Sequence, residues 1–211
     1  MADAYPTAVR RIGDVNFEAD SRQRILDAAL EELHAKGILG LRIADVAAKA
    51  GVSQSAIYKF YRDRDGLLAK VLGDLLRSFH ESDAAAIREF LNNAPDPLDP
   101  GDLAVLFTHP SREDRKWRRW MRMNCFVAAS EIPALWSELG RSQGEFIDQI
   151  EQVAIEVRAR TGAVGPFESR AFALAVASNL FGLVYNDVID EKISDDSYFA
   201  FMREFLRHNL S

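Results

Sequence analysis

The most informative segment of the sequence runs from Ile43 to Tyr58, IADVAAKAGVSQSAIY. Gly51 suits the left-handed backbone that ends a helix. Val52 can fill the gap between two crossing helices, and Ser53 can cap the second one. Two short helices around such a turn form a helix-turn-helix, whose second helix carries side chains to base edges in the major groove of DNA. The pattern indicates DNA recognition; the alternative is an ordinary corner between two helices.

Patterns typical of enzymes and metal sites are missing from the sequence. There is no phosphate-binding loop, no dinucleotide fingerprint and no nucleophile elbow. No histidine has a metal-type spacing to another ligand residue. The histidines are His34, His80, His109 and His208. A single cysteine, Cys125, excludes an internal disulfide. We therefore expect no catalytic residue, no metal and no other cofactor.

Apolar residues recur at helical spacing along most of the chain, and no strand alternation stands out. The sequence predicts an all-α protein of about nine helices. We expect residues 1–19 to form a mobile arm, and Asp20 or Ser21 to cap the first helix. Gly37 and Gly40 should end it. Later helices are expected at 43–50, 53–61, 63–91, 102–108, 113–131, 134–160, 167–190 and 196–209.

The composition is that of a soluble globular protein, with 48% hydrophobic and 27% charged residues over 211 residues. The net charge is −6, but residues 20–70 carry nine Lys or Arg and seven Asp or Glu. A slightly basic segment therefore precedes an acidic remainder. The longest uncharged run, Ala171 to Asn186, has 16 residues, which is short of the ~20 that span a bilayer. No signal peptide is apparent. We expect a cytoplasmic protein without membrane contact.

The stretch from Arg22 to Leu72 resembles the tetracycline-repressor (TetR) family of bacterial transcription regulators. The matching pieces are Ile25-Leu-Asp-Ala-Ala-Leu30, Gly37, Asp45-Val-Ala47, Ala50-Gly-Val-Ser53, Ile57-Tyr58, Phe60-Tyr61 and Leu67-Leu68. The resemblance implies a DNA-binding domain at 20–73 and an effector-binding and dimerisation domain at 74–211. The family usually has Thr where Arg42 stands, and His-Phe where Phe60-Tyr61 stand, so the contacts at these positions differ.

The resemblance also implies which residues touch DNA. Gln54, Ser55 and Lys59 would face the major groove, with Ala56 close to the bases. Arg64 and the tyrosines would reach phosphates, and Arg42 would do so at the start of the second helix. The implied DNA-binding set is Arg42, Ser53, Gln54, Ser55, Ala56, Tyr58, Lys59, Tyr61 and Arg64. The alternative for each is a solvated polar side chain or, for the tyrosines, packing between helices.

The second domain should bind a small apolar or aromatic effector. Trp117, Trp120, Met121, Asn124 and Cys125 share one face of a predicted helix and could line an aromatic pocket. The expected effector-binding set is Phe107, Trp117, Trp120, Met121, Asn124, Cys125 and Asn179. The alternative is plain hydrophobic core. The same helix carries the basic run Arg112, Arg115, Lys116, Arg118, Arg119 and Arg122, which we interpret as a solvated face rather than a site for an anion.

The last two helices are expected to form a homodimer interface. Residues 171–186 are apolar nearly all round, so a second subunit would explain the missing polar face. The expected interface residues are Phe172, Ala175, Val176, Leu183, Phe199, Met202 and Phe205. The alternative is a central helix inside a monomer.

These expectations combine into one function: a ligand-responsive regulator, most simply a repressor, that an effector releases from a near-palindromic double-stranded operator. The family also includes activators. The alternative is a helical small-molecule-binding protein or enzyme whose N-terminal helices are only structural.

Overall fold

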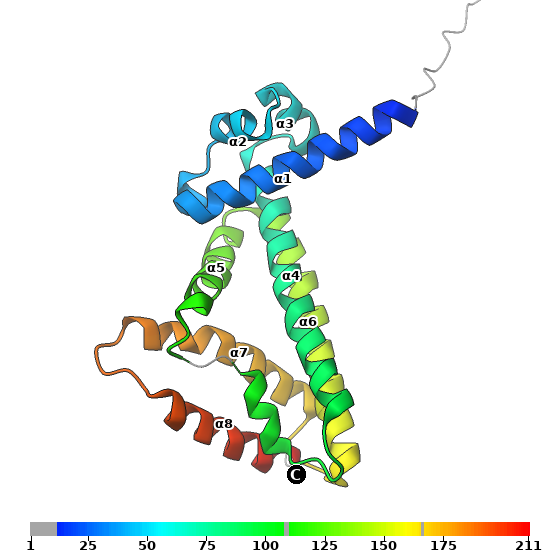
Figure 1. Cartoon of the computed structure of the whole chain (residues 1–211), viewed down its shortest axis with the longest axis vertical. Helices are drawn as coiled ribbons and strands as arrows, with labels where there is room; N and C mark the ends of the chain where they lie inside the picture. Colours follow the sequence, from blue (N-terminus) through cyan, green and yellow to red (C-terminus); the bar gives the residue numbers. More distant parts are fainter. Residues whose placement is uncertain (1–11, 108–109, 166) are drawn as a thin grey trace, which may run out of the picture. The chain divides into compact units, whose positions relative to one another are not determined.

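The structure, a computed structural model, describes residues 12–107, 110–165 and 167–211 as helices joined by loops (Figure 1). No strand occurs in these ranges, so the all-α prediction is confirmed. The elements are α1 (Ile12–Gly40), α2 (Ile43–Ala50), α3 (Gln54–Tyr61), α4 (Arg64–Asn93), the 3-10 helix η1 (Pro100–Leu106), α5 (Glu113–Ala129), α6 (Pro133–Thr161), α7 (Ser169–Val188) and α8 (Asp195–Leu210).

The chain divides into two compact units, with the boundary between Val71 and Leu72. The first unit contains α1 to α3 and the start of α4, and the second contains the rest of α4 and everything after it. The boundary lies close to the one expected after residue 73. Helix α4 is continuous across it.

Helix α1 begins earlier than the sequence predicts. It starts at Ile12, so the prediction of an arm up to residue 19 is wrong for residues 12–19. Residues 1–11 lie outside the described part. Ser21 is inside the helix and 4% exposed, and it accepts a hydrogen bond from Arg24 Nη2 at 3.3 Å, so neither Asp20 nor Ser21 is a cap. Gly37, with φ 69°, interrupts the helical backbone where the sequence predicts an end.

The predicted capping residues of the helix-turn-helix act as expected. Gly51 has φ 66° and ends α2 in the left-handed conformation. Ser53 caps α3, because its Oγ accepts a hydrogen bond from the Ala56 backbone N–H at 3.2 Å. Asp63 Oδ1 accepts from the Gly66 N–H at 2.7 Å at the start of α4. Arg42 gives α2 no side-chain cap, as its residue type requires.

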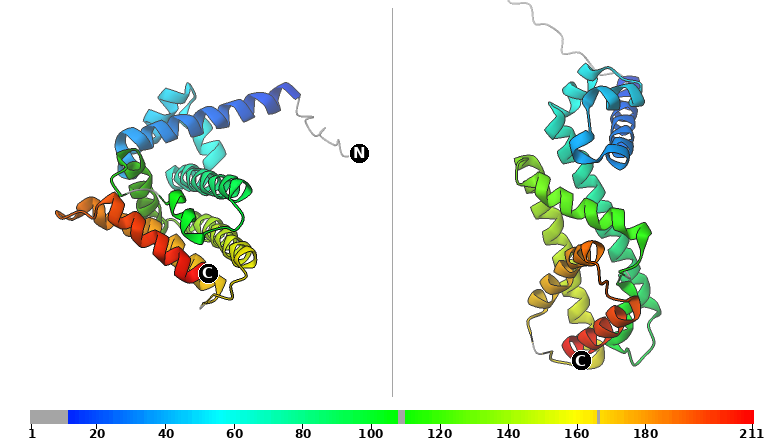
Figure 2. Two further views of the ribbon diagram at one scale, coloured as in Figure 1. Left: turned by 60° about the horizontal axis from the view of Figure 1, so that its bottom comes forward. Right: turned by 90° about the vertical axis from the view of Figure 1, so that its left-hand side faces the viewer.

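The second unit is a bundle in which α6 packs against α7, η1 packs against α8, and α5 contacts both α6 and α7 (Figure 2). One core cluster of its described residues joins α4, η1, α6, α7 and α8. The buried members are Leu91, Leu98, Leu103, Ala104, Ala154, Val157, Phe172, Leu183, Tyr198, Met202, Leu206 and Leu210. This arrangement brings the ends of the domain's sequence, in α4 and α8, into one core.

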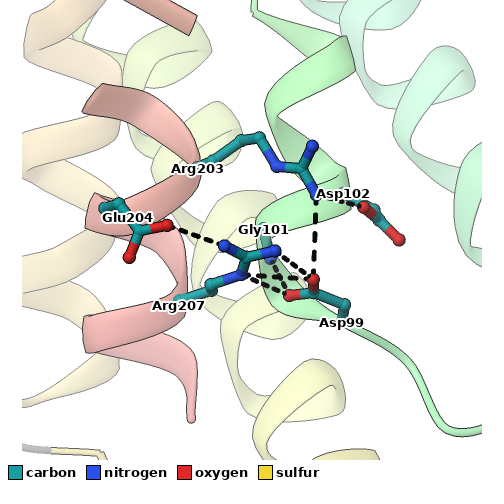
Figure 3. A network of polar contacts seen from close by, with 6 residues as sticks. All are labelled: Asp99, Gly101, Asp102, Arg203, Glu204 and Arg207. Carbon is teal, nitrogen blue, oxygen red and sulfur yellow. Dashed lines mark hydrogen bonds and ion pairs between the residues drawn. The ribbon is translucent and has the colours of Figure 1, made fainter. Parts of the chain in front are cut away.

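A polar network fixes η1 to α8 (Figure 3). Asp99 caps η1 by accepting from the Gly101 N–H at 2.8 Å, and it also accepts from Arg207 Nε at 3.0 Å. Arg203 pairs with Asp102 at 3.3 Å across the same contact. The hydrogen bonds from Arg207 lower the pKa of Asp99 to about 2, so the carboxylate is charged at any physiological pH.

Helix α7 is long and apolar enough to cross a membrane by length and composition alone. It nevertheless packs in the bundle through Phe172, Ala173 and Ala177, which are buried. Its other face is exposed although apolar: Leu174 is 56% and Tyr185 73% exposed. The described helix therefore has a core-facing side and an uncovered apolar side.

Candidate functional site

Helix α3 presents a polar face to solvent. Gln54, Ser55, Tyr58 and Lys59 are exposed, and Ile57 is its one buried residue. Ala56 is half-buried and Ser53 is exposed. Because the buried side chain fixes one side of so short a helix, the opposite side can meet another molecule without any change in the fold. The predicted contact residues on α3 thus lie on one accessible surface.

Three residues predicted to contact DNA already have partners within the first unit. Lys59 Nζ forms an ion pair with Glu18 Oε1 at 2.8 Å, although the lysine side chain remains 63% exposed. The Tyr61 hydroxyl donates to the Arg22 carbonyl at 3.4 Å. Arg64 donates from Nε to the Leu41 carbonyl at 3.0 Å and from Nη2 to the Ile38 carbonyl at 2.6 Å. Arg64 therefore holds the connection between α1 and α2, a role that sequence reasoning missed.

Ion pairs join α1 to α2 within the first unit. Glu32 is 5% exposed and binds both Lys36 at 2.7 Å and Lys49 at 3.0 Å. These hydrogen bonds lower the pKa of Glu32. Arg24 Nη1 donates to the Ala50 carbonyl at 3.0 Å, which satisfies the C-terminal end of α2. The C-terminal end of α2 is thereby fixed on α1, and the turn that carries α3 starts from this fixed point.

The second unit contains a cavity of about 180 Å³ among its helices. Helices α4, α6, α7 and α8, together with η1, give it a largely apolar wall. The apolar lining residues are Ala86, Ile87, Leu103, Leu106, Phe107, Phe146, Ile150, Val153, Phe172, Val176, Leu180, Leu183, Leu206 and Leu210. Ser82 and Asp83 of α4 add polar groups. A cavity with apolar walls and few polar groups is the usual form of a small-molecule site.

Helix α5 lines this cavity with arginines alone: Arg115, Arg118, Arg119 and Arg122. Arg119 is 4% and Arg122 5% exposed. The interpretation of the basic run as a solvated face is therefore wrong for these residues. Their spacing of i, i+3, i+4 and i+7 puts them on one helix face, and this was the signal in the sequence that could have identified them.

The predicted effector residues are mostly elsewhere. Phe107 lines the cavity, but the other six do not. Trp117 packs edge-on against Phe79 with ring centroids 6.2 Å apart, and Trp120 is 36% exposed. The remaining four are Met121 and Cys125, which are buried, Asn124, which is exposed, and Asn179, which accepts a hydrogen bond from the Tyr198 hydroxyl at 2.5 Å. The residues of α5 chosen from the sequence therefore lie on a face of the helix that does not line this cavity.

Cys125 has an environment that suppresses its reactivity. The side chain is fully buried, and burial raises the pKa of its thiol to about 12. Because the thiolate is the nucleophile, we expect the native protein not to react with Ellman's reagent at pH 8. Addition of guanidinium chloride should release one reactive thiol per chain. Rapid labelling of the native protein would contradict the buried position.

The predicted dimer residues lie mainly inside the subunit. Phe172, Leu183 and Met202 are buried in the core, and Val176, Phe199 and Phe205 are partly buried and pack against it. Only Ala175 is exposed. The assignment is therefore wrong for the three core residues. Helix α7 has two apolar faces, and the periodicity of its sequence did not indicate which face is inside the subunit.

Metal chemistry has no support in the described ranges, where no group of three His, Cys, Asp or Glu side chains could hold an ion. His80, for example, has partners other than a metal. Its Nδ1 lies 2.9 Å from Ser142 Oγ, and its ring stacks on Phe146 with ring centroids 4.4 Å apart. Burial lowers the pKa of His80 to about 4, so the ring is neutral at physiological pH. It is a satisfied core residue.

Sequence comparison identifies the first unit. Residues 25–71 match the family model described as bacterial regulatory proteins, tetR family. The HTH-type transcriptional regulator BetI of Cronobacter sakazakii is 32% identical over 74 residues, which are 35% of this chain and 37% of that protein. BetI of Escherichia coli K12 is 33% identical over 68 residues, or 32% and 35% of the two chains. The chain thus matches just over a third of the length of these curated relatives.

Solved structures share the fold over most of the chain. A TetR-family transcriptional regulator from a Rhodococcus species has a TM-score of 0.66 at 19% identity, covering 92% of this chain and all of that one. A transcriptional regulator from Saccharomonospora viridis in complex with choline has a TM-score of 0.68 at 16% identity, covering 91% and 98%. FadR of Bacillus subtilis in complex with stearoyl-CoA has a TM-score of 0.58 at 15% identity, covering 88% and 97%.

Proposed function

We propose that this chain, whose N-terminal domain belongs to the TetR family of bacterial regulators, is a ligand-responsive transcriptional regulator that binds operator DNA. The observation that carries the proposal is the exposed polar face of α3 in the domain that the family model matches. The chain is taken to act without catalysis, since proteins of this family are generally regulators rather than enzymes. We place it in the cytoplasm, where it can reach DNA.

In this proposal α3 enters the major groove. Gln54 can donate to and accept from adenine, Ser55 can bond either base of a pair, and Lys59 can bond guanine or a phosphate after release from Glu18. Ala56 is close enough to the exposed face to meet a thymine methyl group. Tyr58 and Arg42, both exposed, would contact phosphates. Ser53, Tyr61 and Arg64 instead support the helices, because their side chains already form hydrogen bonds within the domain.

A homodimer would use the exposed face of α7 rather than its buried one. Leu174, Tyr185 and, on α8, Phe201 are more than half exposed. Ala175, Ser178 and Gly182 are exposed between them and have small side chains that permit close helix approach. Several large apolar side chains exposed on one helix are typical of an interface. Two copies joined here would carry two recognition helices, which suits a near-palindromic operator.

Regulation requires an effector that binds two states of the protein with different affinity. The cavity lined by the arginines of α5 is the proposed effector site, because it combines apolar walls with convergent polar groups. Release from DNA on effector binding would make the protein a repressor. The competing function is that of a small-molecule-binding protein with a purely structural N-terminal domain. The same cavity would then hold the small molecule.

The test is selection from a labelled DNA library at near-physiological salt, followed by sequencing of the bound fraction. We expect enrichment of an inverted repeat. Weak, salt-sensitive binding without enrichment, in protein refolded to remove any bound ligand, would overturn DNA recognition and favour the competing function.

Two variants then test the assignment of α3 on the selected operator. Lys59→Ala and Gln54→Ala should each weaken operator binding by about 1–3 kcal/mol, because each removes a side chain that contacts a base. Lys70→Ala, on the exposed surface of α4, is the charge-matched control for Lys59→Ala. Fluorescence anisotropy gives the affinities. Equal affinities of Lys59→Ala and the unmodified protein at several salt concentrations would exclude Lys59 as a contact.

A further inference from the structure

We propose that the cavity of the second unit takes an apolar molecule that ends in a carboxylate, and that the arginines of α5 bind this end. The inference rests on the proposed function, since it names the chemical class of the effector. It narrows the sequence-based expectation of an apolar or aromatic effector by adding a negative charge.

The division of the cavity wall is the first observation. All four lining residues of α5 are arginines, and their only polar companions in the lining are Ser82 and Asp83. Every other lining residue is apolar. These residues lie in α4, α6, α7 and α8 and in or directly after η1. A ligand that fills this space must satisfy a charged surface on one side and an apolar one elsewhere, as an apolar molecule with an anionic end does.

The charge balance of the arginines is the second observation. Asp83 is shared: its Oδ1 accepts from Arg118 and its Oδ2 from Arg122, each at 2.7 Å. Arg119 has its own carboxylate, Asp187, at 2.5 Å. Two guanidinium groups on one carboxylate leave an excess positive charge in a place where both arginine side chains are nearly buried, at 11% and 6% exposure. Burying uncompensated charge is costly, so an added anion is favoured.

Unsatisfied donors are the third observation. Among the described residues, the buried Nε–H groups of Arg118 and Arg122 have no hydrogen-bond partner. Buried polar groups without a partner are rare, and each is a place where a ligand can gain affinity. Desolvation lowers the pKa of Arg118 to about 10 and also lowers that of Arg122, because burial disfavours the charged form of a guanidinium group.

The arrangement around Asp83 and Asp187 indicates a carboxylate rather than a cation. Each of these two side chains is already held by guanidinium nitrogens of α5, Asp187 through both Arg119 Nε at 3.1 Å and Nη2 at 2.5 Å. The cavity-lining arginines of α5 are thus arranged to bind carboxylate oxygens. A quaternary ammonium ion such as choline, which the Saccharomonospora viridis regulator binds, would be repelled by the same arginines.

Calorimetric titration of the purified full chain tests the proposal with three probes that have similar alkyl chains and different head groups: decanoate, decanol and decyltrimethylammonium. We expect decanoate to bind about 10- to 100-fold more tightly than decanol, since a charge-assisted hydrogen bond distinguishes them, and the ammonium to bind more weakly still. Binding of decanol or the ammonium as tight as that of decanoate overturns the proposal, and so does the absence of decanoate binding.

Arg122→Met is the decisive variant, because it keeps an unbranched apolar stem, removes the guanidinium group and leaves Asp83 paired with Arg118. Its affinity for decanoate should fall about 10- to 100-fold, with little change for decanol. Arg141→Met, at an arginine of α6 that is 65% exposed, is the control and should bind decanoate normally. Arg118→Met serves the same purpose if Arg122→Met fails to fold. An unchanged decanoate affinity in the folded variant contradicts the assignment.

Direct titration separates this inference from the proposed function, because no DNA is present. Decanoate binding without release of the selected operator would leave the carboxylate site standing and contradict effector-controlled release. Specific operator binding without any decanoate binding would contradict the carboxylate site and leave the proposed DNA-binding function standing.

Discussion

Replacing Ile57 with alanine should unfold or loosen the helix-turn-helix and abolish specific DNA binding. Ile57 is the single buried residue of the eight-residue helix α3, and its side chain is fully buried. A helix this short has little stability of its own, so packing must hold it in place. Truncation of a buried isoleucine leaves a cavity and costs about 2–5 kcal/mol. Chemical denaturation followed by circular dichroism gives the change in the free energy of unfolding.

The matched control is Gln54→Ala on the exposed face of the same helix. It should change the free energy of unfolding by less than about 0.5 kcal/mol while still weakening operator binding. The two variants thus separate the support of α3 from its contacts. If Ile57→Ala kept both full stability and full operator affinity, the buried side of α3 would have been assigned incorrectly.

The second large effect concerns the ion pair between Arg119 and Asp187, whose side chains are 5% and 6% exposed. Asp187→Ala leaves the guanidinium of Arg119 buried without its counter-charge, and the carbonyls of Arg112 and Pro110, at 3.3 and 3.4 Å, replace it poorly. Loss of one partner of a buried pair costs about 3–5 kcal/mol. We expect a loss of that size in the free energy of unfolding, measured by urea denaturation.

Two comparisons give this prediction its meaning. The double variant Arg119→Met with Asp187→Ala should recover part of the loss, because no buried charge then remains. Arg170→Ala removes an exposed arginine that pairs with Asp148 and Glu151, and it should cost less than about 1 kcal/mol. Equal losses for Asp187→Ala and Arg170→Ala would contradict the burial of the Arg119 pair.

The sequence was sufficient for features that depend on neighbours along the chain. The cap by Ser53, the left-handed Gly51 and the break at Gly37 were all predictable, because a helix end is decided by a few adjacent residues. The start of α1 was not, since residues 12–19 have no apolar periodicity to mark a helix. Apolar periodicity predicts only those helices that pack one face against a hydrophobic core.

The sequence was insufficient wherever the answer depended on which face of a helix meets which neighbour. Arg64 has the residue type of a phosphate ligand, yet backbone carbonyls of Ile38 and Leu41 occupy its guanidinium. Trp117 and Arg118 are adjacent on α5, and only the arginine lines the cavity. Phe172 was expected at a subunit interface because α7 is apolar on all sides. Periodicity gives the faces, and tertiary packing decides their use.

The cavity also has a consequence for how such a protein can diversify. Its charged wall comes from one helix, α5, and is held by Asp83 and Asp187, while the apolar wall is spread over other elements. Substitutions such as those at Val176 or Ile150 would reshape the space for the ligand's body without disturbing the arginines. The head group and the body of the ligand are thus set by separate parts of the chain, so preference for one can drift over evolutionary time while the other is inherited unchanged.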